Sequence, residues 1–139
     1  MILLDTNVLS ELMRPAPDAA VLSWIESVDD SSLATAAPVL AELLTWVALL
    51  PPGRRRDELT EALHGILAAF VGRIWAFDDM AAAEYAVIVA SRRATGAPIS
   101  TMDAQIAAIA RSRGAAVATR DLHGMACGGL VLVDPWSYA

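Results

Sequence analysis

Short, mostly apolar runs alternate along the chain with longer amphipathic segments, and this alternation predicts strands separated by helices. Glycine, proline and charged residues bound the apolar runs, as they commonly bound buried strands. The predicted strands cover residues 1–4, 32–35, 73–77, 115–119 and 129–134.

The intervening segments have the periodicity of helices and begin with residues that favour a helix N-terminus. The predicted helices cover residues 7–13, 17–28, 38–50, 54–70, 78–93 and 101–114. The predicted start residues are Asp18, Pro38, Asp78 or Asp79, and Ser100 or Thr101. Strands that alternate with helices predict a parallel sheet covered on both faces, in a single domain over residues 1–139.

Composition narrows the class of protein. Hydrophobic residues make up 56% of the chain, which is enough for a packed core. No apolar run approaches the ~20 residues of a membrane span, and we expect neither a membrane helix nor a signal peptide. Cys127 is the only cysteine, which excludes an internal disulfide and fits a reducing cytoplasm.

The charge pattern argues against a protein that coats nucleic acid in general. The net charge is −6, and all 10 basic residues are arginines, several of them grouped at 54–56, 92–93 and 111–113. Arginine suits bidentate contact with phosphate, although such groups are also typical of a solvated helix face. An acidic protein can still bind a polyanion when a divalent cation lies between the two.

Four carboxylates occupy equivalent places relative to the predicted strands. Asp5 follows the first strand and Asp121 follows the fourth. Glu42 lies in the first turns of the helix after the second strand, and Asp103 in the first turn of the helix before the fourth. Ligands of open α/β sheets bind beyond the carboxyl ends of the strands, so we expect these four side chains to converge there. The alternative is that each acid only caps a helix or a turn.

The surroundings of these acids favour a metal site. Glu42 lies between Leu40, Ala41, Leu43 and Leu44, where an unpaired carboxylate is costly. Clustered acids repel one another, whereas hard divalent cations bind carboxylate oxygens. The two histidines lie in an amphipathic helix and in a Gly-rich loop, away from any nucleophile.

The segments "ILLDTNVLSEL", "LAELL", "PISTMDAQIAAIA", "VATRD" and "DPW" together strongly resemble a PIN-domain ribonuclease. The likeness is to toxins of bacterial type II toxin–antitoxin pairs, the VapC and FitB-like group, and it covers essentially the whole chain. It implies a three-layer α/β/α fold with a short five-stranded parallel sheet. It also implies RNA cleavage with Mg²⁺ or Mn²⁺, a homodimer, and a cognate antitoxin.

The resemblance assigns roles residue by residue. The acids that bind metal and carry out catalysis match Asp5, Glu42, Asp103 and Asp121. Thr6 and Asn7 match the polar residues beside the first acid, with Asn7 expected to fix the Asp5 carboxylate. Thr119 and Arg120 match the residues before the last acid and are expected to contact phosphate. The chain departs from common family patterns at Trp46, Met102 and Gly124, the last standing where another subgroup has its acid.

The acidic pocket also suggests how a partner inhibits the enzyme. A basic residue of an antitoxin peptide is expected to pair with the carboxylates, with its apolar neighbours lying along helices near Trp24 and Trp46. The alternative is a catalytically silent PIN module that binds RNA or a protein. A haloacid-dehalogenase-type phosphatase is disfavoured because Asn7 replaces its second acid, and a receiver domain because the chain has no lysine.

Overall fold

The computed structural model describes residues 1–139 and contains a parallel sheet of five strands in the order β3-β2-β1-β4-β5. The strands are β1 (Ile2–Leu4), β2 (Leu33–Ala36), β3 (Ile74–Trp75), β4 (Ala116–Ala118) and β5 (Leu132–Val133). All five coincide with predicted strands, but β3 and β5 have 2 residues each and are shorter than predicted. β3 and β5 are the edge strands of the sheet, and each pairs with a neighbour on one side only.

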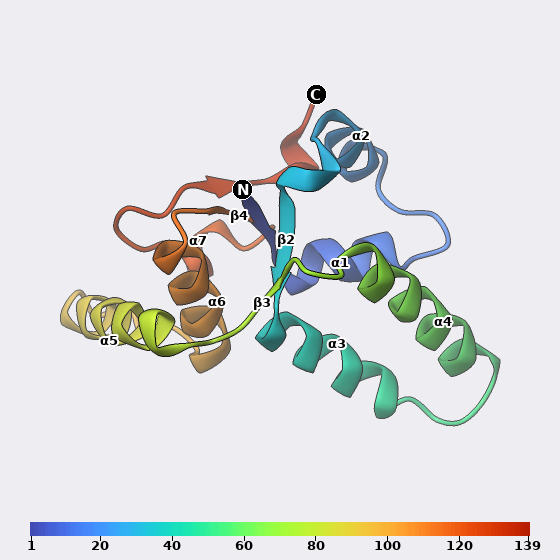
Figure 1. The fold of residues 1–139 in the computed structure, drawn as a ribbon, viewed down its shortest axis with the longest axis horizontal. Helices are drawn as coiled ribbons and strands as arrows, with labels where there is room; N and C mark the ends of the chain where they lie inside the picture. Colours follow the sequence, from blue (N-terminus) through green and yellow to red (C-terminus); the bar gives the residue numbers. More distant parts are fainter.

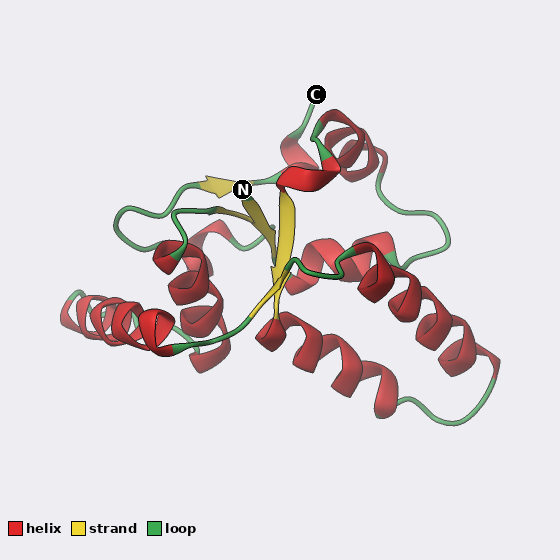
Figure 2. Ribbon diagram, in the orientation of Figure 1, coloured by secondary structure: helices red, strands yellow, loops and turns green.

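Seven α-helices cover the sheet (Figures 1 and 2). They are α1 (Thr6–Leu12), α2 (Ala19–Ser27), α3 (Ala37–Ala48), α4 (Arg54–Ala69), α5 (Asp79–Ala94), α6 (Thr101–Ser112) and α7 (Leu122–Met125). In Figure 2, α5 and α6 lie on one side of the strands and α1, α3 and α4 on the other, which confirms the three-layer arrangement. None of these helices has both the length and the apolar character needed to cross a membrane.

The helix starts follow from local hydrogen bonding. The Asp18 carboxylate accepts from the backbone N–H of Ala20 at 2.8 Å, and Pro38 lies in the first turn of α3. The two open alternatives resolve in favour of Asp78 and Ser100, whose side chains accept from backbone N–H groups of the next turn. The single turn α7 was not predicted; it begins at Asp121, which caps it through the N–H of Gly124.

The central strand β1 places the candidate site. The chain passes from β1 to β2 on one side and later reaches β4 on the other, so the strand order reverses between β1 and β4. Leu3, Leu4 and Val117 on these two strands are fully buried in a core of 27 residues. The crevice beyond the carboxyl ends of β1 and β4 is therefore the expected ligand site of this sheet.

Candidate functional site

Asp5 stands at the carboxyl end of β1 and is the N-cap of α1, where it is only 5% exposed. One carboxylate oxygen accepts from the backbone N–H of Thr6 at 2.7 Å. The other accepts from the Thr119 hydroxyl, just beyond β4, at 2.8 Å. Donors that directly follow two neighbouring strands, β1 and β4, thus hold this carboxylate in place.

The Thr119 hydroxyl is the centre of a small network. Besides donating to Asp5, it accepts from the Asn7 side-chain amide at 3.2 Å and from the backbone N–H of Asp121 at 3.1 Å. These three bonds use all the hydrogen-bonding capacity of a hydroxyl group. The Asn7 carbonyl oxygen in turn accepts from the backbone N–H of Arg120 at 3.2 Å. The network joins the start of α1 to the segment after β4.

The other three acids come from separate helices. Glu42 of α3 accepts from the Thr6 hydroxyl at 2.8 Å. Asp103 lies in the first turn of α6, where its backbone N–H donates to the Ser100 hydroxyl at 3.2 Å. Asp121 accepts from the backbone N–H of Gly124 at 2.9 Å.

These acids line one cavity of about 300 Å³ that has no hydrophobic side chain in its wall. Its lining residues are Asp5, Thr6, Asn7, Ser10, Glu42, Asp103 and Asp121. The predicted convergence of Asp5, Glu42, Asp103 and Asp121 is therefore what the structure shows. None of the four takes part in an ion pair, since the three ion pairs of the chain involve other acids.

Burial and the charges of neighbouring acids raise the affinity of Asp5 and Asp103 for protons. The pKa of Asp5 is raised to about 6, chiefly by burial and to a smaller extent by the charges of Asp103 and Glu42, against the opposing effect of the hydrogen bonds from Thr119 and Thr6. Burial also raises the pKa of Asp103, and the charge of Asp121 adds to that shift. The Ser100 hydroxyl and the charge of Arg92 oppose it. The cavity is a site where positive charge is favoured.

The side chains of this cavity suit a hard divalent cation, because such ions prefer oxygen ligands and four carboxylates line the wall. As arranged here, no group of three or more His, Cys, Asp or Glu side chains could hold one metal ion. Glu42 and Asp121 each have an oxygen engaged in a hydrogen bond. The residues fit a cation by chemistry and position, and side-chain rotation is needed to gather them around it.

One of the supporting residues, Thr119, lies differently from expectation. Thr119 is fully buried and donates to Asp5, so it stands behind the carboxylate and does not face the cavity. Asn7 reaches Asp5 through the Thr119 hydroxyl, to which its side-chain amide donates. Arg120 is exposed, and its guanidinium lies 5.0 Å from the centre of the Trp136 ring.

Gly124 explains one departure from the family pattern. A Cβ built at this position collides with the carboxylate of Asp121. An acidic side chain at residue 124 is thus incompatible with this placement of Asp121, which here supplies the acid of the segment. Trp24 differs from the prediction as well, because it is 5% exposed and is part of the core, whereas Trp46 is 39% exposed.

A larger groove adjoins the carboxylate cavity and was not predicted. It has a volume of about 600 Å³ and shares Thr6, Asn7, Ser10 and Glu42 with the cavity. Its other lining residues are Glu11, Arg14, Leu43, Trp46, Arg55, Arg120 and Trp136. The one signal in the sequence is the spacing of Asn7, Ser10 and Glu11, which places three polar residues on one face of a helix, with Arg14 just beyond its end.

Comparison with known proteins places this geometry in a family. The family described as PIN domain matches residues 2–123. The chain is 41% identical to VapC ribonuclease Y4jK of Sinorhizobium fredii, covering 100% of both proteins. It is 40% identical to Toxin FitB of Neisseria gonorrhoeae, covering 98% of this chain and 99% of that protein. The crystal structure of FitAcB from Neisseria gonorrhoeae superimposes with a TM-score of 0.92 at 40% identity, over 99% of both chains.

Proposed function

Because the chain belongs to the PIN-domain family, we propose that it is a metal-dependent endoribonuclease and the toxin of a type II toxin–antitoxin pair. The observation that carries this proposal is the cavity lined by four carboxylates, none of which is in an ion pair. Its relatives include proteins named as a VapC ribonuclease and a toxin. The proposed reaction is hydrolysis of RNA phosphodiester bonds.

Mg²⁺ or Mn²⁺ is the proposed cofactor, held by Asp5, Asp103 and Asp121. When bound, such an ion neutralises charge on the phosphate and lowers the pKa of a coordinated water. Glu42 either ligates the ion or orients the attacking water. Asn7 and Thr119 hold Asp5 in place from behind, through the hydrogen bonds described above. Arg120 lines the groove that adjoins the cavity, where it can meet the substrate.

A catalytically silent PIN module is the alternative, and the presence of all four acids disfavours it. The test is incubation of the purified chain with varied RNAs, with Mg²⁺, with Mn²⁺ and with a chelator, followed by sequencing of the cut ends. Discrete cuts that need the metal support a nuclease. RNA that is bound but left intact under every metal condition supports the silent module.

We further propose that a cognate antitoxin restrains this activity in the cytoplasm. A basic residue of an extended antitoxin segment enters the carboxylate cavity and competes with the cation. Neighbouring apolar residues of that segment lie against the exposed side of Trp46.

Replacement of Glu42 by Gln and of the basic residue of the antitoxin by Ala should each weaken the complex. Mg²⁺ should weaken it as well, which titration calorimetry at several Mg²⁺ concentrations can measure. Affinity that is indifferent to all three changes places the inhibitor outside the active site.

A homodimer is also proposed, since Leu44 on α3 is 44% exposed and Leu49, at the C-terminal end of that helix, is 80% exposed. Residues of this size are usually covered when they cluster on one helix. A monomeric mass by light scattering at micromolar concentration contradicts the dimer.

A further inference from the structure

We propose that the groove beside the carboxylate cavity binds the single-stranded segment of RNA that adjoins the cleaved phosphate. In this proposal Arg55 and Arg120 contact phosphates, and Trp46 and Trp136 stack on bases. The inference rests on the proposed function, because it assigns the substrate-binding part of the same site.

The cavities of this region form one continuous path. The carboxylate cavity shares Thr6, Asn7, Ser10 and Glu42 with the groove of about 600 Å³. That groove shares Ser10, Arg14, Trp46 and Arg55 with a third cavity of about 390 Å³, which ends near Pro15 and Leu59. A chain-like ligand that enters the carboxylate cavity therefore has an open path away from it.

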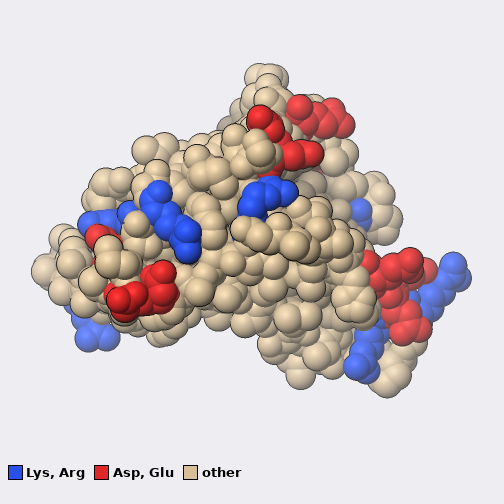
Figure 3. All heavy atoms as spheres, in the orientation of Figure 1, with Lys and Arg blue, Asp and Glu red and all other residues tan.

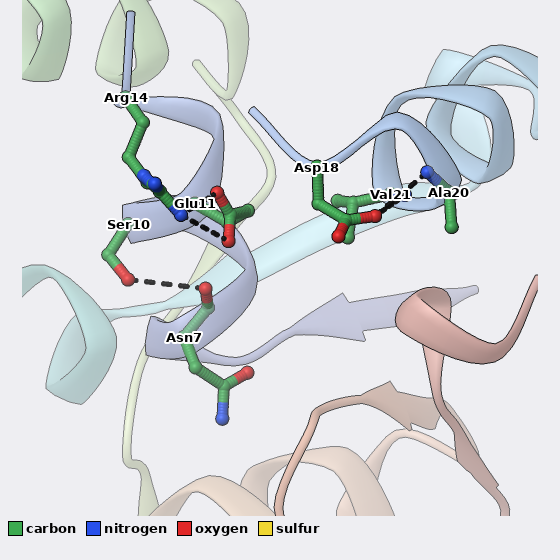
Figure 4. A network of polar contacts seen from close by, with 7 residues as sticks. All are labelled: Asn7, Ser10, Glu11, Arg14, Asp18, Ala20 and Val21. Atoms are coloured by element: carbon green, nitrogen blue, oxygen red, sulfur yellow. Dashed lines mark hydrogen bonds and ion pairs between the residues drawn. The ribbon is translucent and has the colours of Figure 1, made fainter. Parts of the chain in front are cut away.

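One face of α1 forms the floor of this path. Figure 4 shows Asn7 and Ser10 following one another along α1, and Arg14, just beyond the C-terminal end of the helix, paired with Glu11. α1 has 7 residues, so the path along it is about 10 Å long. This length suits a short stretch of polymer and exceeds what one bound ion or one phosphate requires.

The charges of the groove are complementary to a polyanion. Arg14 is already neutralised by Glu11 at 3.0 Å. Arg55 and Arg120 belong to no ion pair and line the groove as free cations. Figure 3 shows acidic and basic side chains intermixed on the face it draws, where no large area of one sign is seen. In a chain of net charge −6, two free arginines beside the carboxylate cavity are a local exception.

The aromatic side chains favour unpaired bases. Trp46 is 39% exposed at the groove, and Trp136 carries the Arg120 guanidinium 5.0 Å from its ring centre. Tryptophan rings and arginine planes both offer flat surfaces on which a free base can stack. Bases within a duplex are already stacked on one another, so these surfaces select a single strand.

Arg120 links the groove to the acids. Its backbone N–H donates to the Asn7 side chain, and the same side chain holds Thr119 behind Asp5. Hydrogen bonds therefore fix the backbone of Arg120 relative to Asp5, and the Trp136 ring supports its guanidinium. A phosphate held by Arg120 has a defined place relative to the carboxylates.

The test measures binding of a fluorescent single-stranded oligoribonucleotide to the full chain carrying Asp5→Asn, which keeps the RNA intact. In this background Arg55→Ala and Trp46→Ala should each weaken binding by about 5-fold or more. Arg55→Ala should also lower the slope of log affinity against log salt by about 0.7, the value for one lost phosphate contact on a single strand. Trp46→Phe, which keeps an aromatic face, should retain most of the affinity.

Matched controls lie on the other side of the molecule. Arg93→Ala removes the same charge from α5, where Arg93 is exposed and in no ion pair, and Phe77→Ala removes an aromatic side chain of similar exposure, 37%. Both should change RNA affinity by less than 2-fold (~0.4 kcal/mol). Losses equal to those of the groove variants overturn the proposal, as does tighter binding to duplex RNA of the same sequence.

Groove variants that weaken an antitoxin peptide but leave RNA affinity unchanged also overturn the proposal and assign the groove to the peptide. Cleavage by the native chain with Mg²⁺ is measured on the same RNA. Absence of cleavage contradicts the proposed function, while the binding comparison still decides whether the groove takes RNA.

Discussion

The two ends of the sheet treat their acidic side chains in opposite ways. At the amino end, Glu84 of α5 and Arg111 of α6 form an ion pair of 3.0 Å beside the starts of β1 and β4. At the carboxyl end, four carboxylates share a cavity and none of them is in an ion pair. The same fold therefore contains one acid that is paired with an arginine and one cluster of four acids without an ion pair.

The contrast separates a structural acid from acids with a proposed function. A charge removed from water is costly unless it is paired with an opposite charge. Arg111 supplies that opposite charge for Glu84. The cost at the other end is visible in Asp5, whose pKa is raised to about 6 by burial. An arrangement that lowers stability in the free protein is typical of a site that awaits a cationic ligand.

The largest expected effect is on catalysis. Asp5→Asn should lower metal-dependent RNA cleavage by at least about 100-fold, because it removes a proposed ligand of the metal. Glu84→Gln makes the same carboxylate-to-amide change at the opposite end and should leave the rate within about 2-fold. Initial rates on one RNA with saturating Mg²⁺ measure both. Full activity in Asp5→Asn, or equal losses in both variants, removes the distinction between the two ends.

The next effect is on stability, and it has a defined sign with pH. A carboxyl group whose pKa is 3.8 unfolded and about 6 folded stabilises the protein in its protonated form, and that stability is lost as pH rises between these values. The full loss is about 3 kcal/mol at pH 8. Asp5→Asn avoids this loss of stability, but it also removes the hydrogen bond that Thr119 donates to the carboxylate, at a cost of about 1 kcal/mol. The Thr119 hydroxyl already accepts two hydrogen bonds and cannot accept a third from the new amide group.

Asp5→Asn should therefore be more stable than the native chain by about 2 kcal/mol at pH 8 without metal, and the advantage should shrink as pH falls to 5. Urea unfolding in the presence of a chelator, at several pH values, measures this difference. Asp79→Asn is the control, because Asp79 is exposed on α5 and the change should be nearly independent of pH. An advantage for Asp5→Asn that grows toward low pH contradicts the assigned cause.

The carboxylate cluster was predictable because topology alone determines it. Asp5 and Asp121 follow strands directly, and Glu42 and Asp103 lie within the first turns of helices that begin at the same edge of the sheet. In a parallel sheet these positions must meet. The same reasoning predicted all five strands and six of the seven α-helices, with errors at the edge strands and at the single turn α7.

The groove was not predictable because it depends on how separate helices pack. Arg14, Arg55 and Trp136 lie far apart in the sequence and meet only through the placement of α1, α4 and the C-terminal segment. Hydrophobic periodicity predicts which face of a helix is buried but not the crossing angle that brings two polar faces together. The burial of Thr119 was missed for a related reason, since its position beside Asp5 depends on the pairing of β1 with β4.

The smallest expected effect concerns the ion pair at the amino end. Arg111→Met leaves Glu84 without its partner, and because the two side chains are 24% and 34% exposed, solvent screening limits the loss of stability to about 1 kcal/mol. Adding Glu84→Leu removes the unpaired charge and should recover most of the lost stability. Urea unfolding of the two variants and the native chain at pH 7 measures it, and cleavage should be unchanged in both. If the double variant instead loses nuclease activity while remaining folded, the amino end of the sheet also serves function, and the contrast between paired and unpaired acids no longer marks the active site.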